Sequence, residues 1–381
     1  MAGKNSSSIR TDLKLNDNLV IKSAGSDLYR IGLSLFTLNG VKRKFVYNPY
    51  FTSIITYGYT LKLFVSLLIH SNDRRVCLLL GDFPYFIGLQ WHLGISCVLH
   101  GLVPVFSQTI HLWYYWKGIE PTYLRPFLMM SGMISPESIG LTDSRIVERL
   151  LKRSRLQFFI CHEVLKSRIP TGALVSGIPF AMKCSLFEFF LLGIPWVTLF
   201  TLWVYVTSDY IFHQVNYFSI ICYYLKLKLK VLNTRIETQI KIGKRLNITD
   251  VKDLCKSYDS IHREIKQFND NMWSSFLASF VFIFMLTITI VIYSVIYGSF
   301  GFILKIVFIY IFVAQTIFLL SIIWTASSVG VEANKSYPLL NKLYVRSTWF
   351  FLSVYHRIKV ILFLFYTIID FSYSSTVIEF D

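Results

Sequence analysis

Few side chains in this sequence have the types and the spacing that catalysis or metal binding requires. The sequence contains no phosphate-binding loop, no dinucleotide-binding fingerprint and no nucleophile elbow. His162 and Glu163 begin a zinc-binding pattern, but no second histidine follows at the required spacing. The six cysteines form no Cys-x-x-Cys pair, and we expect them to be buried apolar side chains or reduced thiols. The sequence therefore predicts no enzyme, no metal site and no cofactor.

A set of aromatic side chains near the outer ends of apolar stretches could instead bind a small organic ligand. Aromatic walls with a few hydrogen-bonding groups are typical of ligand pockets. The alternative is that these rings anchor helices at the membrane interface, where tryptophan and tyrosine are enriched. The candidate ligand-binding residues, which we expect at one common depth, are Trp91, Trp203, Tyr205, His213, Tyr217, Tyr293 and Tyr297.

Polar side chains inside the apolar stretches are few, and polar groups in a membrane are costly enough to be candidates for function. We expect Lys62 to reach outward and Glu188 to lie near Lys183 at the inner boundary. An ion-coupled transporter usually has more buried carboxylates, or helices broken by glycine and proline in matching positions, and neither pattern is present. The side chains concerned are Lys62, Glu188, His213, Gln214, Gln315 and Asp370.

The elements that must position these side chains are long apolar helices. Of the 381 residues, 54% are hydrophobic and only 16% are charged, whereas about 25% of the residues in soluble domains are charged. Because a helix needs about 20 mainly apolar residues to cross a bilayer, the sequence predicts an all-α, polytopic protein with seven transmembrane helices in a single domain, 1–381. The seven stretches are Tyr50–His70, Phe86–Phe106, Ser185–Tyr205, Tyr210–Leu225, Ser274–Tyr297, Phe300–Ala326 and Val360–Ile378.

The positions of lysine and arginine predict the orientation, since basic segments stay on the cytoplasmic side. Four segments hold 34 of the 38 basic residues, namely 1–49 with eight, 117–183 with ten, 226–272 with eleven and 328–359 with five. The amino terminus is therefore predicted to be cytoplasmic, and we expect short outer hairpins at Thr207–Tyr210 and Tyr297–Phe300. The net charge of +16 reflects this arrangement and predicts contact with an anionic lipid bilayer, with no nucleic-acid partner.

Two of the basic segments, 226–272 and 328–359, are predicted to continue the membrane helices as a helical cytoplasmic base. Apolar residues recur every three or four positions there, which places them on one helix face. The stripes could pack within one chain as a helical hairpin, or they could join subunits. The residues proposed to join subunits are Leu229, Leu232, Ile261 and Ile265.

Three segments carry a resemblance to a known family. They are YFSIICYYLKLKLKVLN, FNDNMWSSFLASFVFIFMLTITIVIY and IIWTASSVGVEANKSYPLLNKLYVR. With the inward amino terminus and the short outer turns, this layout over roughly residues 45–365 resembles the arthropod gustatory and odorant receptor superfamily, particularly its gustatory-receptor-like members. The signature of the family's last helix is matched in part, by Ser372-Tyr373, then SSTVI, then Glu379-Phe380, with two of its four defining residues changed.

The resemblance implies a chemosensory receptor of the plasma membrane that detects taste or odour compounds. It implies a cation channel gated by small organic ligands and assembled from four identical or related subunits. The ligand pocket would lie among the outer parts of helices two to six, and the last helix would line the pore. The alternatives are a secondary transporter of an organic solute and a membrane-embedded lipid-modifying enzyme.

The candidate pore-lining residues are Thr367, Asp370 and Ser374, which share one face of the last predicted helix. A charged side chain that faced lipid would cost at least a few kcal/mol. This face should therefore meet water, either in a pore or beyond the membrane.

Overall fold

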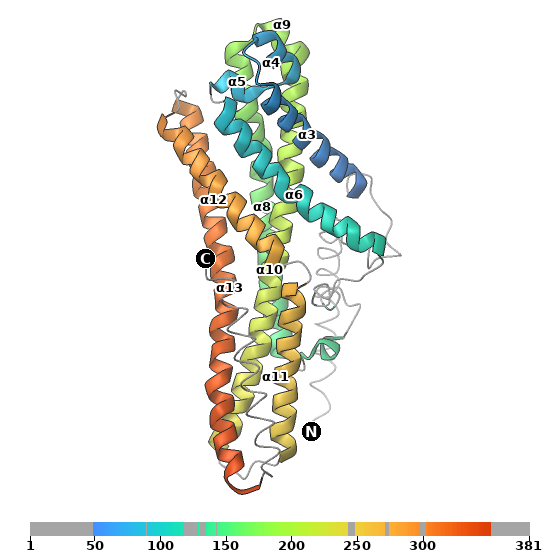
Figure 1. Ribbon diagram of the computed structural model, residues 1–381, viewed down its shortest axis with the longest axis vertical. Coiled ribbons are helices and arrows are strands. Elements are labelled where there is room, and N and C mark those ends of the chain that lie inside the picture. Colours follow the sequence, from blue (N-terminus) through green and yellow to red (C-terminus); the bar gives the residue numbers. More distant parts are fainter. Residues whose placement is uncertain are drawn as a thin grey trace, which may run out of the picture. The chain divides into compact units, whose positions relative to one another are not determined.

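The computed structural model describes residues 49–88, 90–117, 126, 129, 135–141, 143–242, 248–270, 274–297 and 302–351. These residues are almost entirely helical and include no strand, which confirms the predicted all-α class for this part of the chain. The elements, drawn in Figure 1, are α3 (Pro49–Ile69), α4 (Arg74–Leu80), α5 (Phe83–Ile87), α6 (Gln90–Lys117), the 3₁₀ turn η3 (Pro136–Ile139), α8 (Ser144–Lys183), α9 (Leu186–Glu188), the π-helical turn η4 (Phe189–Gly193), α10 (Ile194–Ile242), α11 (Ile248–Phe268), α12 (Ser274–Tyr297) and α13 (Phe302–Phe351).

Three segments of the described chain are long and apolar enough to cross a membrane. They are Leu186–Lys241, Leu277–Tyr297 and Lys305–Leu343, and Ser53–Ile69 is a shorter apolar helix. These segments are compatible with a membrane protein, whereas the number of seven crossings and the inward amino terminus stay predictions. The predicted seventh helix and nearly all of segment 1–49 lie outside the described residues.

The predicted hairpin at Thr207–Tyr210 is wrong. A single helix, α10, runs through it, so the third and fourth predicted crossings belong to one helix. The polar pair Thr207 and Ser208 does not form a turn, because both side chains are buried against the bundle. The Thr207 hydroxyl donates to the carbonyl oxygen of Trp203 at 2.8 Å, so its polarity is satisfied inside the helix.

The chain reverses instead between α8 and α9, within the segment that was predicted to be an inner loop. The 40-residue helix α8 occupies much of segment 117–183. A capping box then starts the next helical segment: the Glu188 amide donates to Ser185 Oγ at 3.3 Å, and the Ser185 amide donates to Glu188 Oε2 at 2.9 Å.

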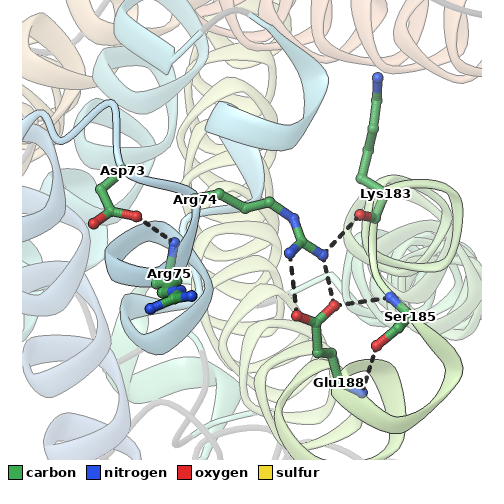
Figure 2. Close-up of polar contacts among 6 residues, drawn as sticks. All are labelled: Asp73, Arg74, Arg75, Lys183, Ser185 and Glu188. Carbon is green, nitrogen blue, oxygen red and sulfur yellow. Dashed lines mark hydrogen bonds and ion pairs between the residues drawn. The ribbon is translucent and has the colours of Figure 1, made fainter.

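An ion pair ties this reversal to α4, as Figure 2 shows. Arg74 donates through Nη1 to Glu188 Oε1 at 3.1 Å, through Nη2 to Glu188 Oε2 at 2.5 Å, and through Nη2 to the Lys183 carbonyl at 3.2 Å. The hydrogen bonds and the negative charge of Glu188 raise the pKa of Arg74 above its ordinary value. The expected pair between Glu188 and the Lys183 side chain is therefore wrong, because the fold brings Arg74 to the carboxylate.

The short helix α4 ends on a glycine that the packing requires. Gly81 has φ +64°, and a Cβ added there would lie 2.3 Å from the Trp196 ring. Lys62 Nζ donates to the Gly81 carbonyl at 2.9 Å and lies 4.9 Å from the centre of the Trp196 ring. A lysine in an apolar helix thus finds an acceptor and an aromatic face at the end of the bundle.

The described chain forms two compact units. The first holds the described residues of Met1–Leu225 and Ile265–Ser328, and the second holds those of Lys226–Glu264 and Val329–Asp381. Helices α10 and α13 each contribute their first part to the first unit and their second part to the second. The prediction of one domain carrying helical extensions stays a prediction.

The described parts of segments 226–272 and 328–359 are helical, as predicted, and in the second unit buried polar groups bond to one another. Asn233 Nδ2 donates to the backbone oxygen of Glu332 at 3.0 Å and to its Oε1 at 3.2 Å. Ser336 Oγ donates to Asn233 Oδ1 at 2.7 Å. All three side chains are buried, so this network joins the end of α10 to the end of α13.

The apolar stripes of the base are largely covered within one chain. Leu229, Leu232 and Ile261 are buried, and Ile265 is partly buried. This burial favours packing within the chain, which is one of the two alternatives that the periodicity left open. A role of these four residues in joining subunits stays a prediction.

Candidate functional site

Three adjoining hollows lie between α6, α8, α10, α12 and α13 in the first unit. The Trp203 cavity has a volume of about 100 Å³ and is bordered by His100, Arg168, Trp203 and Gln315. The Arg168 junction, of about 20 Å³, shares His100, Arg168 and Gln315 with it. The third and largest hollow, the Asn216 cavity, has about 370 Å³ and is lined by Gln157, Ile160, Arg168, Asn216, Tyr310 and Ile317.

The wall of the Trp203 cavity is held rigidly. The Trp203 side chain is 1% exposed, and its Nε1 donates to Thr60 Oγ1 at 3.2 Å. The ring lies 5.4 Å from the Tyr59 ring and 6.3 Å from the His100 ring, between centroids. A Cβ on Gly101 would lie 2.5 Å from Thr60 Oγ1, so only glycine lets α6 approach this wall. The indole is thus oriented by a hydrogen bond and by aromatic contacts.

Arg168 borders all three hollows. Its guanidinium lies over the Phe212 ring at 5.1 Å from the centroid. Its Nε is buried and has no hydrogen-bond partner among the described residues. None of the described residues that line the hollows is acidic, so these walls offer no carboxylate to this charge.

Three further polar groups on the walls are unpartnered within the described chain. They are the Gln315 Oε1, the Asn216 Nδ2 and the Gln157 Oε1. The other end of the Gln157 amide is occupied, since Nε2 donates to Ser219 Oγ at 2.9 Å. Buried polar groups without partners are rare in folded proteins. Gln157 and Asn216 border the Asn216 cavity, and Gln315 borders the other two hollows.

This arrangement can bind and orient a molecule. No cluster of three histidine, cysteine or acidic residues suited to a metal ion occurs in the described part of the chain. His100 contacts the rings of Trp203 and Phe284 at centroid distances of 6.3 and 6.0 Å. A mostly apolar hollow with a few convergent polar groups is the usual form of a small-molecule site.

Of the seven predicted ligand-binding residues, the structure places one, Trp203, on a cavity wall. Tyr217 is buried and Tyr205 is partly buried, and neither lines one of these three hollows. The side chain of His213 lies outside the described residues. The expected common depth is wrong, because α10 is continuous and its residues 203 and 217 are about 21 Å apart along the axis.

The remaining three predicted residues lie at helix ends. Trp91, near the start of α6, is half-exposed, and its Nε1 donates to His70 Nε2 at 2.9 Å. Tyr293 and Tyr297, near the end of α12, are exposed; Tyr293 stacks on His92 at 4.8 Å and on Tyr297 at 4.6 Å. These positions favour the interfacial-anchor alternative for the three rings.

The sequence reasoning missed Arg168 and Asn216 as site residues. Arg168 was assigned to the inner side because it lies in segment 117–183, which holds ten basic residues. A signal was nevertheless present, since Ile169–Met182 carries no charge and is rich in small and apolar residues. The predicted pore residues Thr367, Asp370 and Ser374 lie outside the described residues.

No protein-family model, no curated protein and no solved structure matches this chain. Function is therefore inferred from the cavities and their chemistry, and the resemblance to the receptor superfamily stays a prediction.

Proposed function

We propose that this chain is a multi-pass receptor of the plasma membrane for small organic ligands, and a subunit of a cation channel that those ligands open, like the gustatory and odorant receptors that it resembles. The observation that carries the proposal is the Trp203 cavity with the adjoining Arg168 junction, lined by five helices and bordered by His100 and Gln315. Sites between the helices of a bundle, with apolar walls and few polar groups, are typical of small-molecule binding.

The continuous helix α10 requires a revised topology with the same number of crossings. We propose that α3, α6, the second half of α8, the first part of α10, α12, the first part of α13 and the stretch Val360–Ile378 cross the membrane. The turn at Lys183–Ser185 then lies outside together with α4 and α5. The basic residues of Ser144–Arg155 stay inside, as the positive-inside rule favours.

The proposed mechanism is a ligand-dependent shift between a closed and an open state. A ligand can move this equilibrium only as far as its affinities for the two states differ. Helices α10 and α13 line the cavities and continue without interruption beyond the first unit. Displacement of either helix by a ligand would therefore be transmitted along its own axis.

The cavity chemistry argues against the transporter alternative. Ion-coupled transporters place carboxylates beside their substrate site. The described residues lining the three hollows include no aspartate and no glutamate. A receptor that only binds its ligand needs no such group.

The test is a recording of ligand-evoked cation current from cells that express the full chain, alone and with related receptor subunits. A panel of small esters, alcohols and carboxylic acids is applied at fixed concentrations. We expect Trp203→Ala to raise the half-maximal concentration of an active compound at least tenfold. The matched control is Trp324→Ala, which truncates a tryptophan of α13 that is 78% exposed and should leave that concentration unchanged.

Two results would overturn the proposal. One is the absence of any evoked current from well-expressed protein in every combination. The other is an equal half-maximal concentration for the two tryptophan variants at equal surface levels, which would show that the response does not depend on the cavity.

A further inference from the structure

Arg168 is a cation within the helical bundle, and the described walls of its hollows supply no counter-charge. It precedes the outer end of α8 at Lys183 by 15 residues, which is about 22 Å along the helix axis. An arginine at such a depth is costly unless it is paired with a carboxylate or bonded to backbone oxygens. Its buried Nε has no partner in the described chain, and no lining residue is acidic. An anion from outside the chain would supply the counter-charge and the hydrogen-bond acceptor that the Arg168 guanidinium lacks here.

Asn216 adds a hydrogen-bond donor to the Arg168 site. It is 7% exposed, and its unpartnered Nδ2 lies on a hollow that Arg168 also borders. A carboxylate can accept two parallel hydrogen bonds from a guanidinium. The free Asn216 Nδ2 can donate one more bond to a carboxylate in the Asn216 cavity. One guanidinium matches the charge of a monocarboxylate, whereas a phosphate dianion would leave excess negative charge.

The rest of the Asn216 cavity is apolar. Its walls include Ile160, Val164, Val215, Ile317 and Phe318. If each heavy-atom group takes about 30 Å³, as a water molecule does in the liquid, the volume of about 370 Å³ holds about a dozen groups. The site therefore matches a carboxylate attached to an apolar tail of medium length.

The exposed part of this wall indicates how such a molecule would enter. Ile160 of α8 and both Tyr310 and Ile317 of α13 line the cavity and are exposed. The opening therefore lies between α8 and α13, near the inner end of the part of α8 that we place in the bilayer. A fatty acid partitions into lipid through its tail and would reach Arg168 sideways from the membrane.

We propose that the Arg168 site, comprising Arg168 and Asn216, binds small monocarboxylic acids with an apolar tail. The inference rests on the proposed function, because it assigns a chemical class to the ligand of the same cavities. Arg168 pairs with the carboxylate, Asn216 donates a further hydrogen bond, and the walls of the Asn216 cavity cover the tail.

The test measures direct binding, which does not depend on current. Purified full-length protein in nanodiscs of phosphatidylcholine is equilibrated with radiolabelled decanoate, or with decanol as a neutral molecule of the same length. We expect decanoate to bind at least tenfold more tightly than decanol. Arg168→Gln should weaken decanoate binding by about 10- to 100-fold, the range for a lost charge-assisted hydrogen bond, and leave decanol unchanged.

A matched control and a charge-retaining variant keep the result independent of folding. Arg149→Gln removes the same charge from an exposed position of the same helix and should change neither affinity. Arg168→Lys keeps a cation, so it should fold as the wild type does. Its affinity for decanoate should lie between the affinities of the wild type and of Arg168→Gln. Affinities are compared only for variants that purify as a monodisperse peak of wild-type size.

Three outcomes would overturn the inference. The first is equal affinity for decanoate and decanol with no effect of Arg168→Gln, which would make the site purely apolar. The second is a phospholipid that co-purifies, is lost in Arg168→Gln and is not displaced by decanoate, which would assign the charge to a lipid headgroup. The third is current evoked by other compounds while decanoate fails to bind, in which case the receptor proposal stands alone. Decanoate binding without any evoked current would leave the inference standing and overturn the channel.

Discussion

Two asparagines on α10 show how differently the two units treat buried polar groups. Asn216, in the first unit, is 7% exposed, and its Nδ2 has no partner in the described chain. Asn233, in the second unit, is 4% exposed and bonds to Glu332 and Ser336 through both ends of its amide. A buried amide without a partner costs about 1–3 kcal/mol, so the first arrangement is unfavourable until something fills the hollow.

Charged groups differ in the same way. In the second unit, Lys228 Nζ lies 2.5 Å from Glu264 Oε2, and both side chains are mostly buried. In the first unit, Arg168 has an aromatic neighbour and no carboxylate among the described walls of its hollows. In the second unit, Lys228 and Asn233 thus bond to partners within the chain, whereas the first unit keeps polar groups available for a ligand.

The largest expected effect is a difference in labelling between two positions that we place on opposite sides of the membrane. We replace the exposed Lys183 and Lys241 by cysteine, one at a time, and treat intact cells with a membrane-impermeant maleimide. Lys183→Cys should be labelled in intact cells, because the turn after α8 is placed outside. Lys241→Cys should be labelled only after permeabilisation. The reverse pattern would contradict the proposed topology.

The two asparagines provide the next test. Asn233→Leu leaves Glu332 and Ser336 short of a buried partner, so we expect it to lower the free energy of unfolding by about 2–3 kcal/mol. Asn216→Leu removes an amide that lacks one partner already, so its effect should stay within about 1 kcal/mol in either direction. Denaturation of both variants in the same detergent measures the difference. Equal losses would show that the two amides are equally satisfied.

Two glycines test whether the hollows reflect loose packing of the first unit. A Cβ at Gly101 would meet Thr60 at 2.5 Å, whereas nothing lies within 4 Å of a Cβ at Gly330 in the second unit. Gly101→Ala should therefore cost about 1–2 kcal/mol through overpacking. Gly330→Ala should stabilise α13 by up to about 1 kcal/mol. A thermal midpoint that rises for both variants would indicate that the wall behind Trp203 yields easily.

The smallest effect distinguishes a buried ion pair from an exposed one within the second unit. A double-mutant cycle on Lys228 and Glu264 should give a coupling of about 1–2 kcal/mol. The exposed pair Arg263–Asp259, at 2.7 Å on one helix face, should give about 0.3–0.5 kcal/mol. Comparable couplings would mean that burial does not strengthen the pairing in the second unit.

The sequence alone determined the properties that depend on composition and on spacing along one helix. Apolar runs predicted an all-α chain with membrane-length helices, and the described residues are helical. Spacings of three and four predicted which side chains of the base turn inward, and Leu229, Leu232 and Ile261 are indeed buried. These properties follow from the helical period of 3.6 residues and from the preference of apolar groups to leave water.

The tertiary structure decided where each polar group finds a partner. Glu188 bonds to Arg74, 114 residues earlier, and Asn233 bonds to Glu332, 99 residues later, so neither pairing follows from local sequence. Thr207 and Ser208 were interpreted as a turn, yet neighbouring helices bury both inside α10. Arg168 was assigned to a loop, yet it borders three hollows. The type of a side chain sets its charge. The free-energy cost of burying that charge depends on which helices pack around it, and the spacing of residues along a sequence does not contain this packing.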